Sequence, residues 1–213
     1  MSLQNRVKPD GKIIISASRG MLMGNRGVIH KNKVIVAKFK TKAWITCSIN
    51  YKGIKRVVMT DNLYTELFFL DEATAFSAGH RPCSLCRNKN FKLFKSLWIE
   101  ANAQTFDLTD FSIGSIDRVL HDERISIDGK KLTYSSKLSA LPNGVIIQMA
   151  GSDDFYLYYN QQLLKWSESG YTAITKPNDD LEVNVLTPQS MVKIFGLGYL
   201  CEIHDSAKKL LCS

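Results

Sequence analysis

The chain has 213 residues, of which 45% are apolar and 23% are charged. This is the composition of an ordinary globular protein, and it excludes a largely disordered chain. The length fits one large domain or two small ones. No stretch approaches the roughly 18 consecutive apolar residues of a membrane span. Residues 1–11 are polar and lack the apolar segment of a secretory signal, so we expect a cytoplasmic protein.

The first third of the chain predicts a small β-sheet. Residues 12–16 (KIIIS) have the pattern of a short buried strand. Residues 34–39 and 43–51 are rich in β-branched and aromatic side chains, which favour strands. Lys52-Gly53 is a plausible turn before a further strand at 55–59.

Helices are predicted next. Asp71 is a candidate N-cap for a short helix that Gly79 ends. Residues 90–101 place apolar side chains on one face of an amphipathic helix, and residues 115–124 predict another. A last helix is expected at 187–195, with Thr187 as N-cap and Pro188 at the first helical position.

The second half of the chain is mostly β in pattern. Residues 124–134 predict a hairpin that turns at Asp128-Gly129. Residues 144–150, 155–160 and 162–167 predict further strands. We therefore expect an α+β protein. Residues 1–105 would form a zinc-stabilised small sheet with helices, and residues 106–213 a mostly antiparallel β-rich domain.

Cysteine spacing indicates a metal site. The chain has five cysteines, an odd number that does not suit a disulfide framework. Cys83 and Cys86 form a Cys-x-x-Cys motif, which can bind one tetrahedral ion. Redox dithiols share this spacing, but they follow a strand and open a helix, whereas here the pair follows a helix and the segment GHRP. The residues thus favour Zn²⁺ and leave the other ligands open, with Cys47, His30, His80 or the pair Cys201 and His204 as candidates.

Two blocks around this motif resemble the zinc-binding domain of Ada-type DNA repair proteins. Residues 68–75 (FFLDEATA) and 78–86 (AGHRPCSLC) carry the resemblance, and residues 40–47 (KTKAWITC) resemble the strand with that family's first cysteine. The similarity covers residues 34–87. In that family four cysteines bind zinc, and the first accepts a methyl group from DNA.

The resemblance aligns Cys47 with the methyl acceptor and Cys83 and Cys86 with the last two ligands. Tyr51 stands where the family has its second cysteine. With an imidazole as replacement the sulfur is a weaker nucleophile, so the resemblance implies a structural zinc held by Cys47, Cys83, Cys86 and His30. The whole chain also resembles an uncharacterised bacterial protein family that shares the segments GNRG, GHRPCxxC and VLTPxS.

The charge pattern indicates a polyanionic partner. Lys and Arg exceed Asp and Glu by 28 to 20, a net charge of +8, which favours nucleic acid. Alternate residues of a strand share a face, so Lys38, Lys40 and Lys42 would line one side of it. The predicted nucleic-acid contacts are these lysines with Arg26, Arg81 and Arg87. The alternative is a solvated sheet face with arginines that pair with acids inside the protein.

We therefore expect a zinc-binding protein associated with nucleic acid, most simply DNA. One alternative is a hydrolase whose acid–base groups come from His121, Glu123 and His204, with Glu66 as a further candidate, because imidazole beside carboxylate suits proton transfer. Another is a protein-interaction module in which zinc only supports the fold.

Overall fold

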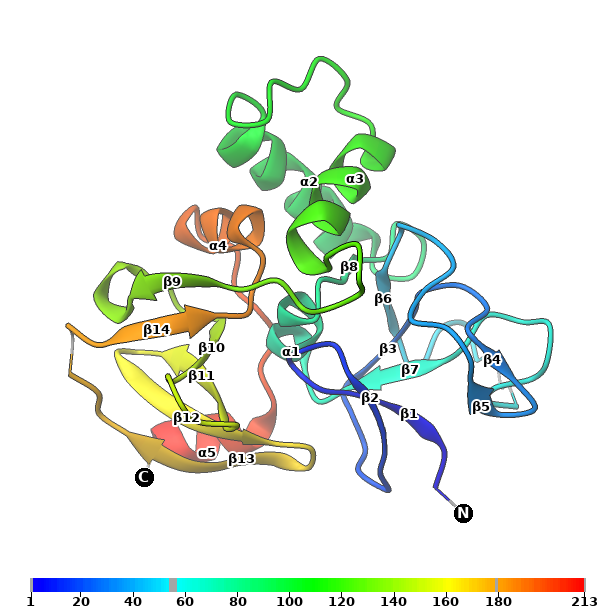
Figure 1. The fold of residues 1–213 in the computed structure, drawn as a ribbon, viewed down its shortest axis with the longest axis horizontal. Helices are drawn as coiled ribbons and strands as arrows, with labels where there is room; N and C mark the ends of the chain where they lie inside the picture. The colour runs from blue at the N-terminus through cyan, green and yellow to red at the C-terminus, as the bar shows by residue number, and fades with distance from the viewer. Residues whose placement is uncertain (1, 54–56, 179, 213) are drawn as a thin grey trace.

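The computed structural model describes residues 2–53, 57–178 and 180–212, and it confirms the α+β class. Two sheets lie on either side of a short central helix, α1 (Glu72–Ser77), with the longer helices α2 (Asn88–Asn102) and α3 (Ile113–Arg124) beyond it (Figure 1). No helix within these residues is long and apolar enough to cross a membrane.

The first sheet is mixed and comes from the N-terminal part of the chain. Its strand order is β2-β1-β7-β3-β6-β8, in which β1 with β7 and β6 with β8 run parallel. The strands are β1 (Gln4–Val7), β2 (Ile13–Ile15), β3 (Leu22–Asn25), β6 (Ile45–Ser48), β7 (Leu67–Phe69) and β8 (Arg81–Pro82), and a separate hairpin joins β4 (His30–Lys31) to β5 (Val34–Ile35).

The second sheet is antiparallel throughout and comes from the C-terminal part, as the sequence predicts. Its order is β13-β12-β11-β10-β14-β9. The strands are β9 (Tyr134–Lys137), β10 (Val145–Gln148), β11 (Phe155–Tyr159), β12 (Gln162–Ser167), β13 (Gly170–Thr175) and β14 (Glu182–Val185), followed by α4 (Gln189–Gly196) and α5 (Asp205–Leu211), with a 3₁₀ turn at Leu138–Ala140.

Helix α1 is buried along its whole length between the sheets. The Asp71 side chain accepts a hydrogen bond from the backbone N–H of Thr74 at 2.9 Å, which confirms the predicted N-cap. Gly79 ends the helix with φ of +84°. A Cβ at that position would lie 2.4 Å from Cδ of Arg124, so both the backbone conformation and the space require glycine.

The main core lies between helices α2, α3 and α4 and the second sheet. Phe94 and Trp98 of α2 are fully buried with Ile116 and Leu120 of α3, and the same cluster includes Val145. The predicted domain boundary near residue 105 falls between α2 and α3, which share this core. The division into two domains stays a prediction.

Several expected elements differ in the structure. The strand predicted at 12–16 forms as β2 but is not buried, since Ile15 is 67% exposed. Helix α4 begins at Gln189, because the Thr187 hydroxyl accepts a hydrogen bond from the N–H of Ile146 in β10 and does not cap the helix. The predicted hairpin at 124–134 is reduced to one bridge, Ile125 to Lys131. Only Val34–Ile35 of residues 34–39 is strand. Of the expected strand 55–59, residues 57–59 are not strand and the first two lie outside the described residues.

Candidate metal centre

Strand pairing brings the three predicted cysteines together. Cys47 lies in β6, and β8 pairs with β6 in parallel, with Ile45 opposite Arg81. The chain continues from β8 into the motif, and the N–H of Cys83 donates to the carbonyl of Thr46 at 2.8 Å. Cys83 is therefore fixed beside Cys47, although the two paired segments are far apart in the chain, with Thr46 and Arg81 35 positions from one another.

The sulfur atoms of Cys47, Cys83 and Cys86 all lie within 4.8 Å of one another. Three sulfurs about 2.3 Å from one tetrahedral ion would lie roughly 3.8 Å apart, so the group has the dimensions of a metal site. Among the residues that the structure describes, this is the one cluster of Cys, His, Asp or Glu ligand atoms close enough to hold a metal.

Hydrogen bonds fix the turn that carries Cys83 and Cys86. The N–H of Leu85 donates to Sγ of Cys83 at 3.4 Å, and the Ser48 hydroxyl donates to the carbonyl of Cys86 at 3.3 Å. A hydrogen bond from the thiol of Cys47, together with the N–H groups of Cys86 and Leu85, lowers the pKa of Cys83 to about 5. Cys83 is thus ionised at neutral pH, and an ionised thiolate is the form that binds metal.

A cavity of about 380 Å³ opens on the cysteine group. All three cysteines line it, so an ion that they hold would face this space. Further lining residues include Tyr51, Tyr64, Phe68, Met23, Asn25 and Glu66.

The predicted fourth ligand, His30, does not join the cysteines. Its Nδ1 lies 2.6 Å from the hydroxyl of Thr65, and its Nε2 lies 3.9 Å from the carboxylate of Asp61. The ring therefore makes its contacts near the hairpin β4–β5, and the structure does not bring His30 to the three cysteines.

The other candidates for the fourth ligand lie elsewhere as well. Nε2 of His80 accepts from Nε of Arg26 at 3.2 Å, and the ring is fully buried against Trp44 and Phe69. Nδ1 of His204 accepts from the N–H of Ser206 at the start of α5. Cys201 lies in the separate cavity that Met21 and Leu211 also line.

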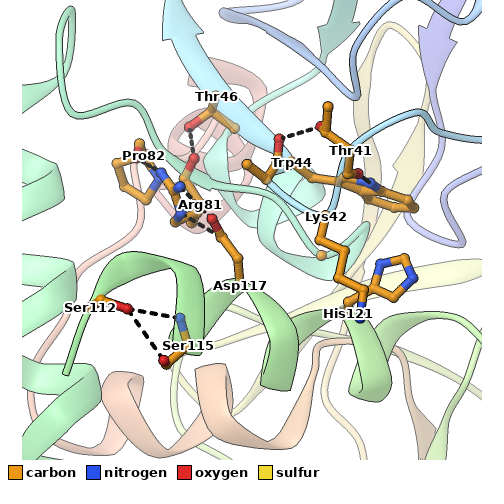
Figure 2. A network of polar contacts seen from close by, with 12 residues as sticks. Thr41, Lys42, Trp44, Thr46, Arg81, Pro82, Ser112, Ser115, Asp117 and His121 are labelled. Atoms are coloured by element: carbon orange, nitrogen blue, oxygen red, sulfur yellow. Dashed lines mark hydrogen bonds and ion pairs between the residues drawn. The ribbon is translucent and has the colours of Figure 1, made fainter. Parts of the chain in front are cut away.

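Three of the predicted nucleic-acid contacts are buried. Arg81 donates two hydrogen bonds of 2.7 Å to Asp117, which Figure 2 shows beneath β6. Arg87 pairs with Glu72 at 2.8 Å, and Arg26 lies over the ring of Trp44 with its guanidinium carbon 3.9 Å from the centroid. Each guanidinium is buried and engaged inside the protein, so phosphate contact by these arginines would require those contacts to break, and it stays a prediction.

The predicted lysines are exposed. Lys38, Lys40 and Lys42 lie in an irregular segment that is not part of a strand, where Phe39 is less exposed and Thr41 is exposed as well. The amine of Lys38 donates to the carbonyl of Gly129 at 2.7 Å. Contact of these lysines with nucleic acid stays a prediction.

The acid–base candidates contact different parts of the protein. His121 packs edge-on against Phe39 at 4.7 Å between ring centroids. Glu123 accepts hydrogen bonds from the N–H and hydroxyl of Ser190 at the start of α4, while His204 caps α5. The contacts of His121, Glu123 and His204 therefore do not form one reaction centre. Of the predicted acid–base groups, only Glu66 lines the cavity beside the cysteines.

Sequence reasoning missed two features of this centre. Asp117, the partner of Arg81, comes from α3 and carries no local signal of that role. Trp44 lies between two arginines, since the guanidinium carbon of Arg124 is 4.0 Å from its ring and that of Arg26 is 3.9 Å away. The signal that could have drawn attention to this packing is the position of Trp44 in the same predicted strand as Cys47.

Comparison of the chain with known protein families, with characterised proteins and with solved structures found no match. The resemblance to the Ada-type domain therefore depends on the sequence blocks alone, and the geometry of the three cysteines is the part of it that the structure reproduces.

Proposed function

We propose that the chain is a zinc protein in which Cys47, Cys83 and Cys86 hold the ion. The observation that carries the proposal is the convergence of three sulfurs within 4.8 Å, from a strand and a turn that are distant in the sequence. Soft thiolate ligands and small tetrahedral dimensions suit Zn²⁺ better than Mg²⁺ or Ca²⁺.

The ion would also have a structural role. It would join β6 to the turn that precedes α2, which is the helix that supplies Phe94 and Trp98 to the main core. Metal binding of this kind contributes directly to folding free energy, because the unfolded chain has no preformed site.

Metal content tests the proposal. We expect about one zinc per chain in the wild type, and loss of zinc in Cys83→Ser and Cys47→Ser, because each change removes a thiolate ligand. Cys212→Ser is the matched control, since this cysteine is exposed and outside the cluster. Wild-type protein without zinc, or equal loss in the control, would count against the proposal.

Association with nucleic acid is a second proposal. It is supported by the exposure of Lys38, Lys40 and Lys42 and by the net charge of +8. Neutralising phosphates with lysine releases counterions, so binding should weaken steeply as salt rises.

The test is fluorescence anisotropy with a nonspecific DNA duplex over a range of salt. Replacing all three lysines by alanine should reduce the salt slope by about two to three. The control replaces Lys137, Lys176 and Lys209, three exposed lysines elsewhere, and removes the same charge. Equal effects of the two triple variants would show that only net charge matters, and would reject this lysine segment as a binding surface.

A further inference from the structure

The three cysteines leave a tetrahedral ion one ligand short. Within the described ranges 2–53, 57–178 and 180–212, no His, Asp, Glu or fourth Cys belongs to the group. Structural zinc sites are closed by four protein ligands, whereas an open position is the mark of sites that bind water or a substrate. A ligand at this open position presupposes the proposed zinc site.

The three cysteines line a cavity, and this is where we place the open position. The cavity of about 380 Å³ has the size of a small-molecule site, and the three ligand cysteines form part of its wall. The wall of the cavity also has aromatic surface, which Tyr51, Tyr64 and Phe68 provide. Aromatic rings favour a planar ligand that can stack on them.

A carboxylate lies in the same wall. Glu66 is only 3% exposed, and one of its oxygens accepts the N–H of Met59 at 2.8 Å, which fixes the side chain. Glu66 is not one of the clustered ligand atoms, so it is not positioned to bind the ion together with all three sulfurs. It is instead available as a polar contact for a molecule that occupies the cavity.

The charges of the metal site and of Glu66 determine which kind of ligand the cavity can bind. Three thiolates on a divalent ion give a net charge of −1, and the Glu66 carboxylate adds to this negative field. An anion such as phosphate would be repelled and would lose its hydration in a largely apolar cavity. A neutral ligand with one lone pair for the metal and one N–H for the carboxylate meets both requirements.

We propose that the fourth position of the zinc ion is filled from the cavity by a neutral, planar nitrogen heterocycle. One ring nitrogen replaces a water molecule on the ion, and a ring N–H donates to Glu66. The exchange is a simple substitution of one neutral ligand for another. Imidazole is the smallest probe with both groups, and N-methylimidazole is the matched probe without the N–H.

Full-length protein loaded with Co²⁺ in place of zinc gives a direct readout, because cobalt has visible absorption that depends on its ligands. Sulfur-to-cobalt charge transfer reports the cysteines, and the d–d bands report the fourth ligand. We expect imidazole to shift the d–d bands in a saturable way, and to bind about tenfold more tightly than N-methylimidazole, the effect of one hydrogen bond to a charged group. Azide, an anionic probe, should bind more weakly than imidazole.

Variants test the role of Glu66. Glu66→Gln should reduce the difference between the two imidazole probes, because an amide oxygen accepts a weaker hydrogen bond than a carboxylate, whereas Glu182→Gln, at an exposed position on β14, should keep it. If Glu66→Gln does not fold, the comparison of the two probes on the wild type still decides the point. Tyr51→Phe should leave the starting spectrum unchanged, and a change would show that Tyr51 itself is the fourth ligand and overturn the proposal.

The outcomes separate this inference from the proposed zinc site. Absence of the sulfur-to-cobalt band would refute the cysteine site and, with it, the open position. A normal sulfur-to-cobalt band with d–d bands that do not respond to imidazole would leave the metal site intact and refute the ligand. Tighter binding of azide than of imidazole would also contradict it.

Discussion

Asp117 of α3 accepts two hydrogen bonds of 2.7 Å from the guanidinium of Arg81, two residues before the first cysteine of the motif. Both side chains are nearly inaccessible, with 6% and 7% exposure. This paired contact connects α3 to β8, and the backbone of Arg81 donates to the carbonyl of Trp44. The position of the metal-binding turn therefore depends on a helix that contributes no ligand (Figure 2).

Breaking this ion pair should be costly. Asp117→Asn leaves the guanidinium of Arg81 buried without a negative partner, and we expect the free energy of unfolding to fall by about 3–5 kcal/mol. Asp122→Asn is the matched control, because Asp122 is exposed on the same helix and should change stability by no more than about 0.5 kcal/mol. Urea unfolding of the full chain measures both, and similar effects of the two variants would contradict the account.

Acid should destabilise the protein partly through His80. Burial, with the neighbouring cations Arg26 and Arg124, lowers the pKa of His80 well below its ordinary value of 6.5. Below pH 6.5 the unfolded chain therefore binds a proton that the folded protein does not, and stability falls as the pH falls.

The variant His80→Gln keeps a group that can accept from Arg26 and removes the titration. Its stability should therefore fall less between pH 6.5 and 5 than that of the wild type, as measured by urea unfolding at each pH. Loss of metal in acid affects both proteins, so the difference between the two curves reports His80. Parallel curves would show that His80 does not contribute.

His30→Ala should retain the metal. The ring contacts Thr65 and Asp61 and is outside the cysteine group, so the variant should contain as much zinc as the wild type. It should nevertheless lose about 1–3 kcal/mol of stability, because the buried hydroxyl of Thr65 loses a partner. Zinc content and urea unfolding on the same preparation measure the two effects, and loss of zinc would restore His30 as a ligand.

The helix ends and buried helix faces that depend on neighbouring residues were predicted from local sequence patterns. The Asp71 N-cap, the glycine end of α1 and the amphipathic face that buries Phe94 and Trp98 follow from residues within a few positions of one another. The convergence of Cys47 with Cys83 and Cys86 was also predicted, because the spacing and the resemblance placed them in one site.

Tertiary partners explain why the surroundings of the arginines could not be predicted from the sequence. An arginine beside a metal motif has the same sequence signal whether it meets phosphate or an acid inside the protein. Arg81 is paired with a residue 36 positions away, and Arg87 with Glu72 on the buried helix α1. The Asp128-Gly129 segment likewise has the composition of a hairpin turn, but in the structure only Ile125 and Lys131 bridge across it.

X-ray absorption at the zinc edge of the purified full chain tests the central claim most directly. The account predicts three sulfur atoms about 2.3 Å from the zinc and one lighter atom at about 2.0 Å, oxygen or nitrogen, in the fourth position. A shell of four sulfurs would mean that a further cysteine completes the site, and a shell with fewer than three sulfurs would contradict the group formed by Cys47, Cys83 and Cys86.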